Sequence, residues 1–375
     1  MTPHGATPYT LPVDVLRTPA SRWLTAGLGA LVALCAGLTS PAAAESSLVD
    51  VGDQAVVIVQ VAGRGNAVTI RTWDRPSVEV DSGDVPATIT HRMTAFGTVR
   101  MPLAAPIPPM PYVAHDGAGQ VTGQGVLPPE DFPYSGFRPG PHDVVRISAE
   151  AGARLTVTVP ASTGLLQTRV GGGLTTIDGY RGADLFVVQN YGRVQMNGVT
   201  TTAFLQMING ALYAVGSSFD RVRVRANAAN IIFERCRSKQ IEATSVSGAI
   251  VYDGGTFDPG LARFESQTGN IALGVTAPAE LAGRTQDGRV YTQFERGTPI
   301  AQPADGAATA TYEGGGPLVN AITTHGSVYL YDGSLANRRA VAPEWRPVQQ
   351  LFSAHRRPAP AIAPHSYRGS SHHGT

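Results

Sequence analysis

The chain has 375 residues, of which 15% are charged, and its formal net charge is +1 at pH 7. A charge balance this close to zero excludes proteins that hold nucleic acid through a strong overall positive field. The 43 glycines and 28 prolines favour a fold with many turns and some segments without regular structure.

Residues 1–44 have the pattern of a secretory signal peptide. Arg17 and Arg22 precede an apolar run over 23–38, and the small residues Pro41–Ala44 end the segment. A retained membrane anchor is the alternative, but glycines interrupt the apolar run and it is short for a span. We expect cleavage after Ala44, no transmembrane span in the mature chain, and a secreted, periplasmic or cell-envelope location.

The chain contains two cysteines, Cys35 and Cys236. Leu34 precedes Cys35, whereas a lipoprotein signal requires a small residue there, so we do not expect a lipid anchor. Cleavage of the signal leaves Cys236 alone, and an intramolecular disulfide is then impossible. We interpret Cys236 as a structural residue and expect the core alone to stabilise the mature chain.

Alternating apolar residues predict strands over 55–61, 66–75 and 78–80. We interpret 45–101 as an N-terminal β cap or as the first coils of the repeat that follows. A stack of strands needs such a cap because its first coil otherwise leaves an unpaired edge.

Residues 102–142 are rich in proline and glycine and have no period. We interpret this segment as a long loop inserted into the β framework, since prolines remove backbone donors. Strands are predicted again at 144–147 and 154–160.

A repeat of about 19 residues occupies 143–335. A small marker residue opens the second apolar strand of each unit, and the markers are Gly173, Gly192, Gly210, Ala229, Gly248, Gly269, Gly288 and Gly326. The position seven before each marker is aliphatic, and the positions two and four after it share one largely apolar face of a strand. This pattern predicts an all-β fold, a single-stranded parallel β-solenoid (β-helix) whose stacked coils bury a continuous core.

An antiparallel β-sandwich with evenly spaced hairpins is the alternative fold. We favour the solenoid because hairpins would not keep the same column apolar from unit to unit. The step from Gly288 to Gly326 is 38 residues, twice the period, and we interpret an excursion from Phe294 to Gly316 as absorbed in this doubled step.

Residues 336–375 form a basic tail that we expect to be mostly disordered. Within the tail, Val348, Leu351 and Phe352 share one face of a potential helix. We predict that this apolar face docks on the stack.

Several segments resemble a known family, namely Thr69–Pro76, Leu155–Ala161, Ser245–Gly254 and Ser266–Leu273. They are similar to the bacterial DUF4097 adhesin family and to the head domain of autotransporter adhesins, over about 50–100 and 144–333. The resemblance implies an extracytoplasmic β-solenoid with an adhesin-like role and supplies no catalytic residues. The Pro-rich insertion, the basic tail and Ala229 in a glycine position depart from the family pattern.

Polar residues recur five positions after the marker, at Asp178, Asn197, Glu234 and Asp253. On stacked coils they would form a ladder, and paired carboxylates can act as general acid and base in carbohydrate-active β-helix enzymes, lyases or hydrolases. Each lies beside a turn glycine or its equivalent, where Asp and Asn bond to the backbone, so we favour a turn role. The enzyme, with Asp178 and Asp253 or a similar pair of carboxylates, is the first alternative function.

Two outward-facing features are candidate binding surfaces. Arg223 and Arg225 alternate with inward valines and could hold an anionic polymer, although solvated arginines are the simpler interpretation. An apolar stripe three positions after the marker comprises Tyr213, Ile232, Val251, Ala272, Tyr291 and Tyr329. Either the tail or the Pro-rich insertion covers this stripe, or it binds a partner through its tyrosines, and we favour intramolecular cover.

These patterns together predict a non-enzymatic protein, an adhesin or a scaffold of the cell envelope. We expect a surface polysaccharide or another envelope protein as partner, no nucleic acid, and neither cofactor nor metal. A bactofilin-like polymerising scaffold is the second alternative, which the signal peptide disfavours because that group is cytoplasmic.

Overall fold

The computed structural model describes residues 46–96, 110–115, 121–127, 140–295, 297–300, 306–337 and 343–356. The chain divides into two units, Met1–Pro41 and Ala42–Thr375, and all described residues belong to the second. The predicted signal peptide and the tail beyond residue 356 lie outside the described residues. Within the described ranges, no helix is long and apolar enough to cross a membrane.

The described chain is all-β, as predicted, with one sheet of 21 strands, one of 2 strands and a single α-helix. The early strands are β1 (Ser46–Asp50), β2 (Val56–Val61), β3 (Asn66–Trp73), β4 (Ser77–Asp81), β5 (Thr88–Phe96), β6 (Met110–His115), β7 (Val121–Leu127), β8 (Gly140–Ala149) and β9 (Arg154–Pro160). The central strands are β10 (Leu165–Asp178), β11 (Asp184–Asn197), β12 (Thr200–Val215), β13 (Ser218–Glu234), β14 (Arg237–Ser245), β15 (Ile250–Phe257), β16 (Ala262–Ser266) and β17 (Ile271–Val275). The last elements are β18 (Ala279–Thr285), β19 (Val290–Gln293), β20 (Gly297–Ile300), β21 (Ala307–Tyr312), β22 (Leu318–Thr323), β23 (Val328–Asp332), two 3₁₀ turns (Leu335–Asn337 and Pro343–Trp345) and α1 (Arg346–Arg356).

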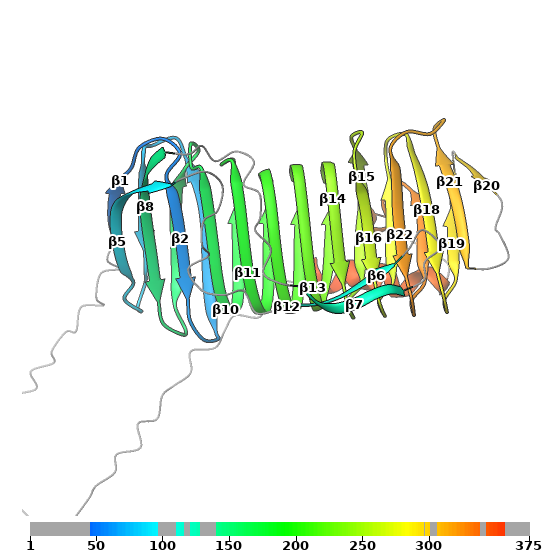
Figure 1. Cartoon of the computed structure of the whole chain (residues 1–375), viewed down its shortest axis with the longest axis horizontal. Coiled ribbons are helices and arrows are strands. Elements are labelled where there is room, and N and C mark those ends of the chain that lie inside the picture. The colour runs from blue at the N-terminus through cyan, green and yellow to red at the C-terminus, as the bar shows by residue number, and fades with distance from the viewer. Residues whose placement is uncertain are drawn as a thin grey trace, which may run out of the picture. The chain divides into compact units, whose positions relative to one another are not determined.

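Parallel pairing joins the central strands side by side in chain order (Figure 1). Leu166 lies opposite Leu185, Leu185 opposite Ala203, and Ala203 opposite Val222. The residues seven positions before each marker are therefore neighbours on adjacent strands, as the repeat predicts. Each coil has a first leg before the marker and a second leg after it. One long strand forms both legs in β10 to β13, whereas separate strands form them from β14 onward.

The core lies between the two legs. Most inward positions predicted from the repeat are buried, including Val194 and Met196 in one coil and Ile271 and Leu273 in another, all at 0% exposure, whereas Val290 and Thr292 in the last coil are half-buried. Cys236 belongs to the same core and is 2% exposed, as expected for a structural residue. Because every coil adds its apolar side chains to this one cluster, the stack is stabilised by burial along its whole described length.

The marker row is built from close backbone approach. A Cβ on Gly210 would lie 1.9 Å from the Gly192 carbonyl oxygen, and one on Gly269 would lie 1.9 Å from that of Gly248. Gly210 also has a φ of +124°, a conformation that L side chains rarely adopt. Glycine therefore recurs in this row because a side chain would collide with the neighbouring coil.

The order of the coils in space departs from the order of the chain at both ends. The β2–β3 coil pairs with β10 on one side and with β8–β9 on the other. The β8–β9 coil therefore occupies the outer position, although it follows β2–β3 in the sequence. Likewise, β22–β23 lies between β16–β17 and β18–β19. The 38-residue step from Gly288 to Gly326 contains the segment with β20 and β21, and the Gly326 coil lies between the Gly269 and Gly288 coils rather than beyond the Gly288 coil.

The large sheet is mixed rather than parallel throughout, because antiparallel strands cover its ends. At one end β5 pairs with β8, β4 with β9, and β1 with β4. At the other end β21 pairs with β18, and β20 with β21. Antiparallel strands thus cover both ends of the stack.

The predicted insertion 102–142 contains more strand than expected. The antiparallel hairpin β6–β7 forms a separate small sheet, and β8 begins at Gly140. The remaining residues of the insertion lie outside the described residues.

Candidate functional site

A polar row runs across the outer face of the first legs at the N-terminal end of the stack. Ser148 of β8 pairs with Gln60 of β2, Gln60 with Arg169 of β10, and Arg169 with Val188 of β11. Alternation along each strand sets this orientation, because the neighbouring residues Val59, Val61 and Val187 belong to the core.

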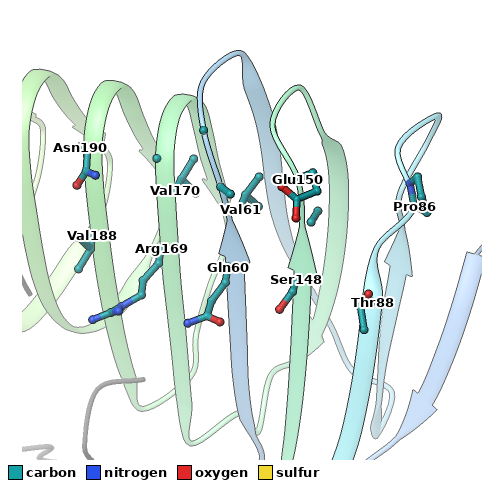
Figure 2. A pocket seen from close by; sticks show the side chains of 14 residues that line it. Gln60, Val61, Pro86, Thr88, Ser148, Glu150, Arg169, Val170, Val188 and Asn190 are labelled. Atoms are coloured by element: carbon teal, nitrogen blue, oxygen red, sulfur yellow. The ribbon is translucent and has the colours of Figure 1, made fainter. Parts of the chain in front are cut away.

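This row borders a cleft of about 550 Å³. Its polar lining comes from Gln60, Ser148, Arg169, Asn190, Glu150 and Thr88. Figure 2 shows Gln60, Arg169 and Ser148 on neighbouring strands, with Asn190 and Glu150 nearer to the turns and Thr88 at the β5 end.

The turns that follow the first legs leave the cleft unfilled. Gly63 and Gly171 line it without side chains, and a Cβ on Gly171 would lie 2.4 Å from the Gly63 carbonyl oxygen. The coils can approach this closely only with glycine at this corner. The cleft therefore follows from the same close stacking that selects glycine in the marker row.

An apolar cluster lies on the same outer face, next to the polar row. It consists of Val56, Ile58, Val144, Leu165, Phe186, Val188 and Phe204, all between 0% and 8% exposed. The Phe186 and Phe204 rings stack with centroids 5.1 Å apart. Val188 belongs both to this cluster and to the cleft lining, so the cleft has a polar side and an apolar side.

The chemistry of the lining suits a ligand with many hydrogen-bonding groups. Gln60 and Asn190 each offer an amide donor and acceptor side by side, Arg169 offers planar donors, and Glu150 and Ser148 accept. Near the cleft, Tyr191 follows Asn190 in the chain and is 42% exposed, with the Arg64 guanidinium carbon 4.5 Å from its ring centroid. The cleft can thus bind a polar ligand without requiring it to be charged.

The predicted apolar stripe lies beneath the C-terminal helix. Tyr213, Ile232, Val251, Ala272 and Tyr329 are at most 6% exposed and form one cluster with Trp345, Val348 and Phe352, while Tyr291 and Leu351 pack against it. The Trp345 ring contacts Tyr329 and Tyr331 edge to face, at 5.1 and 5.6 Å between centroids. The prediction that the tail helix docks on the stack is therefore confirmed. Of the two explanations for the stripe, intramolecular cover holds, and its tyrosines are not an exposed binding surface in this structure.

Asp253 anchors the segment that leads to this helix. Its carboxylate is fully buried and accepts hydrogen bonds from the Tyr331 hydroxyl (2.7 Å), the Leu335 backbone N–H (2.8 Å) and the Ser334 hydroxyl. Asp178 instead accepts one from the Asn197 side-chain amide at 2.7 Å.

The two carboxylates proposed for the enzyme alternative do not come together. Asp178, Asn197, Val215, Glu234 and Asp253 lie on successive paired strands. Four strand spacings place Asp178 and Asp253 roughly 19 Å apart. General acid and base carboxylates in glycosidases are about 5–9.5 Å apart, so this pair cannot act on one bond.

The predicted basic surface is largely compensated. Arg223 pairs with Glu242 of the next coil at 2.9 Å, Arg237 with Asp258 at 2.9 Å, and Lys239 with Asp220 at 2.6 Å. Arg225 lies outward and half-buried in the same row as Arg169. These pairs lower the net positive charge that an anionic polymer would meet.

Sequence reasoning missed the cleft. Most of its residues come from β8, β2, β10 and β11, and they meet because β2 lies between β8 and β10. The available signal was the outward polar residue that ends the first leg of these two coils, Gln60 after Val56 and Ile58 in β2, and Arg169 after Leu165 and Gln167 in β10. Among the described residues there is no cluster of three or more metal-ligating side chains.

No protein-family model matches the sequence, and no curated protein matches it, so the resemblance to DUF4097 has no support from either comparison. A solved structure described as a "putative cell adhesion protein" from Clostridium sporogenes is similar at 7% identity and a TM-score of 0.23. The similarity covers 77% of this chain and 99% of the other. A TM-score this low supports no inference about the fold or function of this chain.

Proposed function

We propose that this protein is a non-enzymatic parallel β-solenoid that acts outside the cytoplasm as an adhesin or envelope-binding scaffold, and that it binds a surface polysaccharide in the cleft beside Gln60 and Arg169. The observation that carries the proposal is the lining of that cleft. It combines amides, a guanidinium group and hydroxyls on one rigid face.

Saccharides match this lining for a physical reason. Adjacent sugar hydroxyls need donors and acceptors a short distance apart, which planar amide and guanidinium groups provide, and bridging water can complete the contacts. The apolar side of the cleft at Val188, and the exposed ring of Tyr191 nearby, would suit the C–H faces of sugar rings. The strands hold these groups at fixed spacing, which limits the entropy lost on binding.

A binding experiment tests the site. The mature chain is screened against bacterial surface polysaccharide fragments, and hits are measured by titration calorimetry. Replacing Gln60 and Asn190 together by alanine removes two hydrogen-bonding side chains and is expected to weaken binding by about 10-fold or more. The control Gln286→Ala changes an exposed residue outside the cleft lining and should leave affinity unchanged.

The outcomes separate the parts of the proposal. Absence of binding to every fragment contradicts a polysaccharide ligand, and equal affinity of the double variant contradicts the cleft as its site. Release of a shortened product during the titration contradicts the non-enzymatic role.

The location needs its own measurement. Cell fractionation with mass analysis of the mature N-terminus is expected to find the chain outside the cytoplasm and beginning near Glu45, as the pattern of residues 1–44 predicts. Full-length protein in the cytoplasm would contradict this part.

A further inference from the structure

The apolar cluster beside the cleft is buried although it faces outward. This outer cluster consists of Val56, Ile58, Val144, Leu165, Phe186, Val188 and Phe204. Its members alternate along the strands with core residues such as Val57, Leu166 and Val187, so their side chains point away from the core. They are nevertheless at most 8% exposed in the single chain. Another part of the same chain must therefore cover them.

The elements already placed do not provide this cover. The helix α1 and Trp345 pack on the stripe of the second legs, whereas the outer cluster lies on the first legs. The antiparallel strands β1, β4, β5, β20 and β21 pair at the two ends of the stack. The hairpin β6–β7 forms its own small sheet and belongs to the insertion. Among the described elements outside the insertion, the cover is therefore missing.

The covered part of this face has a defined width. In the row that contains Phe186 and Phe204, Phe204 of β12 is 4% exposed, and the next two side chains, Arg223 and Glu242, are 30% and 32% exposed. From Val144 in β8 to Phe204 in β12 there are four strand spacings, or roughly 19 Å. A segment that crosses this width and returns needs roughly 12 extended residues.

The insertion begins and ends at the edge of this area. Phe96, the last residue of β5, pairs with Gly140, the first residue of β8. Residues 97–139 therefore leave the sheet and re-enter it at one point. Val144 of the outer cluster follows Gly140 in the same strand. The insertion is long enough to cross the outer cluster and return.

Other parts of the chain are less well placed. Residues 1–45 lead into β1, which joins the second legs through β4 and β9. Residues 357–375 follow α1, which also lies on the second legs. The stretches after β19 that interrupt the described chain are at most five residues long, too short to cross the cluster.

We propose that residues 97–139 dock on the outer cluster, and that their proline-rich stretch packs on the stacked rings of Phe186 and Phe204. This stretch, residues 102–111, contains five prolines together with Leu103, Ile107 and Met110. Proline-rich segments bind aromatic surfaces with little loss of conformational entropy, because their rings already restrict the backbone. The docking explains why this outer face is apolar in the coils nearest the insertion and charged beyond β12.

Photocross-linking in the full-length chain identifies the cover. A benzophenone-bearing phenylalanine in place of Phe204 reacts with C–H bonds that lie against it, and mass spectrometry of the digested protein locates the product. We expect links to residues 97–139. The same probe in place of Gln195, which points outward from a second leg and is half-buried, should give no link to that segment. Links from position 204 to residues 357–375, to residues 1–45 or to a second chain, or links confined to the stack, overturn the proposal.

Hydrogen exchange tests whether the two rings hold the segment. Phe204→Ala removes one of them, and we expect amides of residues 97–139 to exchange about 10-fold faster or more than in the wild type. Gln195→Ala should leave these rates unchanged. The strands β10 to β12 are followed in the same experiment, and if they lose protection, Phe204→Leu, which keeps most of the buried volume, replaces the alanine variant. Unchanged exchange of the insertion while the stack stays protected contradicts docking on these rings.

Discussion

The coils of β10 to β12 and those that follow β13 turn the same corner by different means. In the first group, which we call continuous-corner coils, the strand runs through the corner and the marker glycines have φ values of +105° to +133°. In the second group, the hydroxyl-corner coils, the strand breaks and a serine or threonine three residues before the marker accepts a hydrogen bond from its N–H. The Gly248 and Gly269 amides donate in this way to Ser245 and Ser266, each at 2.9 Å.

The hydroxyls of the second group also tie one coil to the next. Ser266 donates to the Gly248 carbonyl at 3.2 Å, and Thr323 donates to the Gly269 carbonyl at 2.9 Å. In the continuous-corner coils this position holds Val170, Gln189 and Met207. Both groups therefore require glycine at the marker because neighbouring backbones approach closely. Only the continuous-corner coils require it also for an unusual φ.

The largest expected effect comes from adding a Cβ to each kind of corner. Gly210→Ala meets both the Gly192 carbonyl and an unfavourable φ, and we expect it to lower the free energy of unfolding by about 3–5 kcal/mol. Gly269→Ala meets the Gly248 carbonyl and the Ser266 hydroxyl oxygen but no unfavourable φ, and it should lower the free energy of unfolding by about 1–3 kcal/mol. Urea unfolding measures both, and equal losses would show that the φ difference between the corners is without energetic consequence.

The carboxylates five positions after the marker extend the comparison beyond the corner. Asp253→Ala leaves the buried Tyr331 hydroxyl and Leu335 amide without their acceptor, and we expect a loss of about 3 kcal/mol. Asp178→Ala, among the continuous-corner coils, removes one half-exposed hydrogen bond and should cost about 1 kcal/mol. Chemical unfolding gives the two losses, and a change in Trp345 fluorescence should accompany only the Asp253 variant, because that residue anchors the tail.

A smaller effect is expected from exchanging the hydroxyl. Ser266→Ala leaves the Gly269 amide without its acceptor and should lower the free energy of unfolding by about 1–2 kcal/mol. The reciprocal change Ala226→Ser, at the same position in β13, adds a buried hydroxyl to the apolar core and should also destabilise. Thermal unfolding measures the stability of both variants. A stabilising Ala226→Ser would contradict this expectation and show that a hydroxyl can be accommodated at either kind of corner.

The smallest effect concerns Cys236, in the turn between β13 and β14 where the two groups of coils meet. Burial raises the pKa of its thiol to about 12, above the ordinary value of 9.0. The folded state therefore favours the protonated thiol, and its contribution is complete below pH 9 and is lost as pH rises toward 12. At about one pH unit above the ordinary pKa, the free energy of unfolding of the wild type should fall by about 1 kcal/mol relative to that of Cys236→Ala, as measured by urea unfolding. Identical pH profiles of the two proteins would contradict it.

The sequence alone was enough for most of the inward columns and for locating the apolar stripe, but it left open what covers that stripe. A buried row such as Leu166, Leu185 and Ala203 must repeat at the spacing of the coils, so periodicity exposes it directly. The helix carrying Val348 and Phe352 was foreseeable because an apolar stripe and an amphipathic tail each lacked a partner until they met.

Periodicity could not supply the neighbours of each coil. It identifies Gly288 and Gly326 as equivalent, but nothing in the spacing says that Gly326 packs on Gly269 while Gly288 packs outside it. The cleft was missed for the same reason. Periodicity also gave no sign of the unusual backbone at Arg235, which adopts a φ of +53° in a turn position where Gly216 and Gly254 stand in the neighbouring coils.

The inward placement of β2–β3 and β22–β23 affects how the molecule resists being pulled apart. A force applied to either terminus reaches, as its first complete coil, one that is held by neighbours on both sides. The chain cannot be peeled one coil at a time from its ends, as a simple linear stack could, because two interfaces must break together before the first coil is released. Under tension, the terminal coils should therefore detach together above one threshold force rather than one after another.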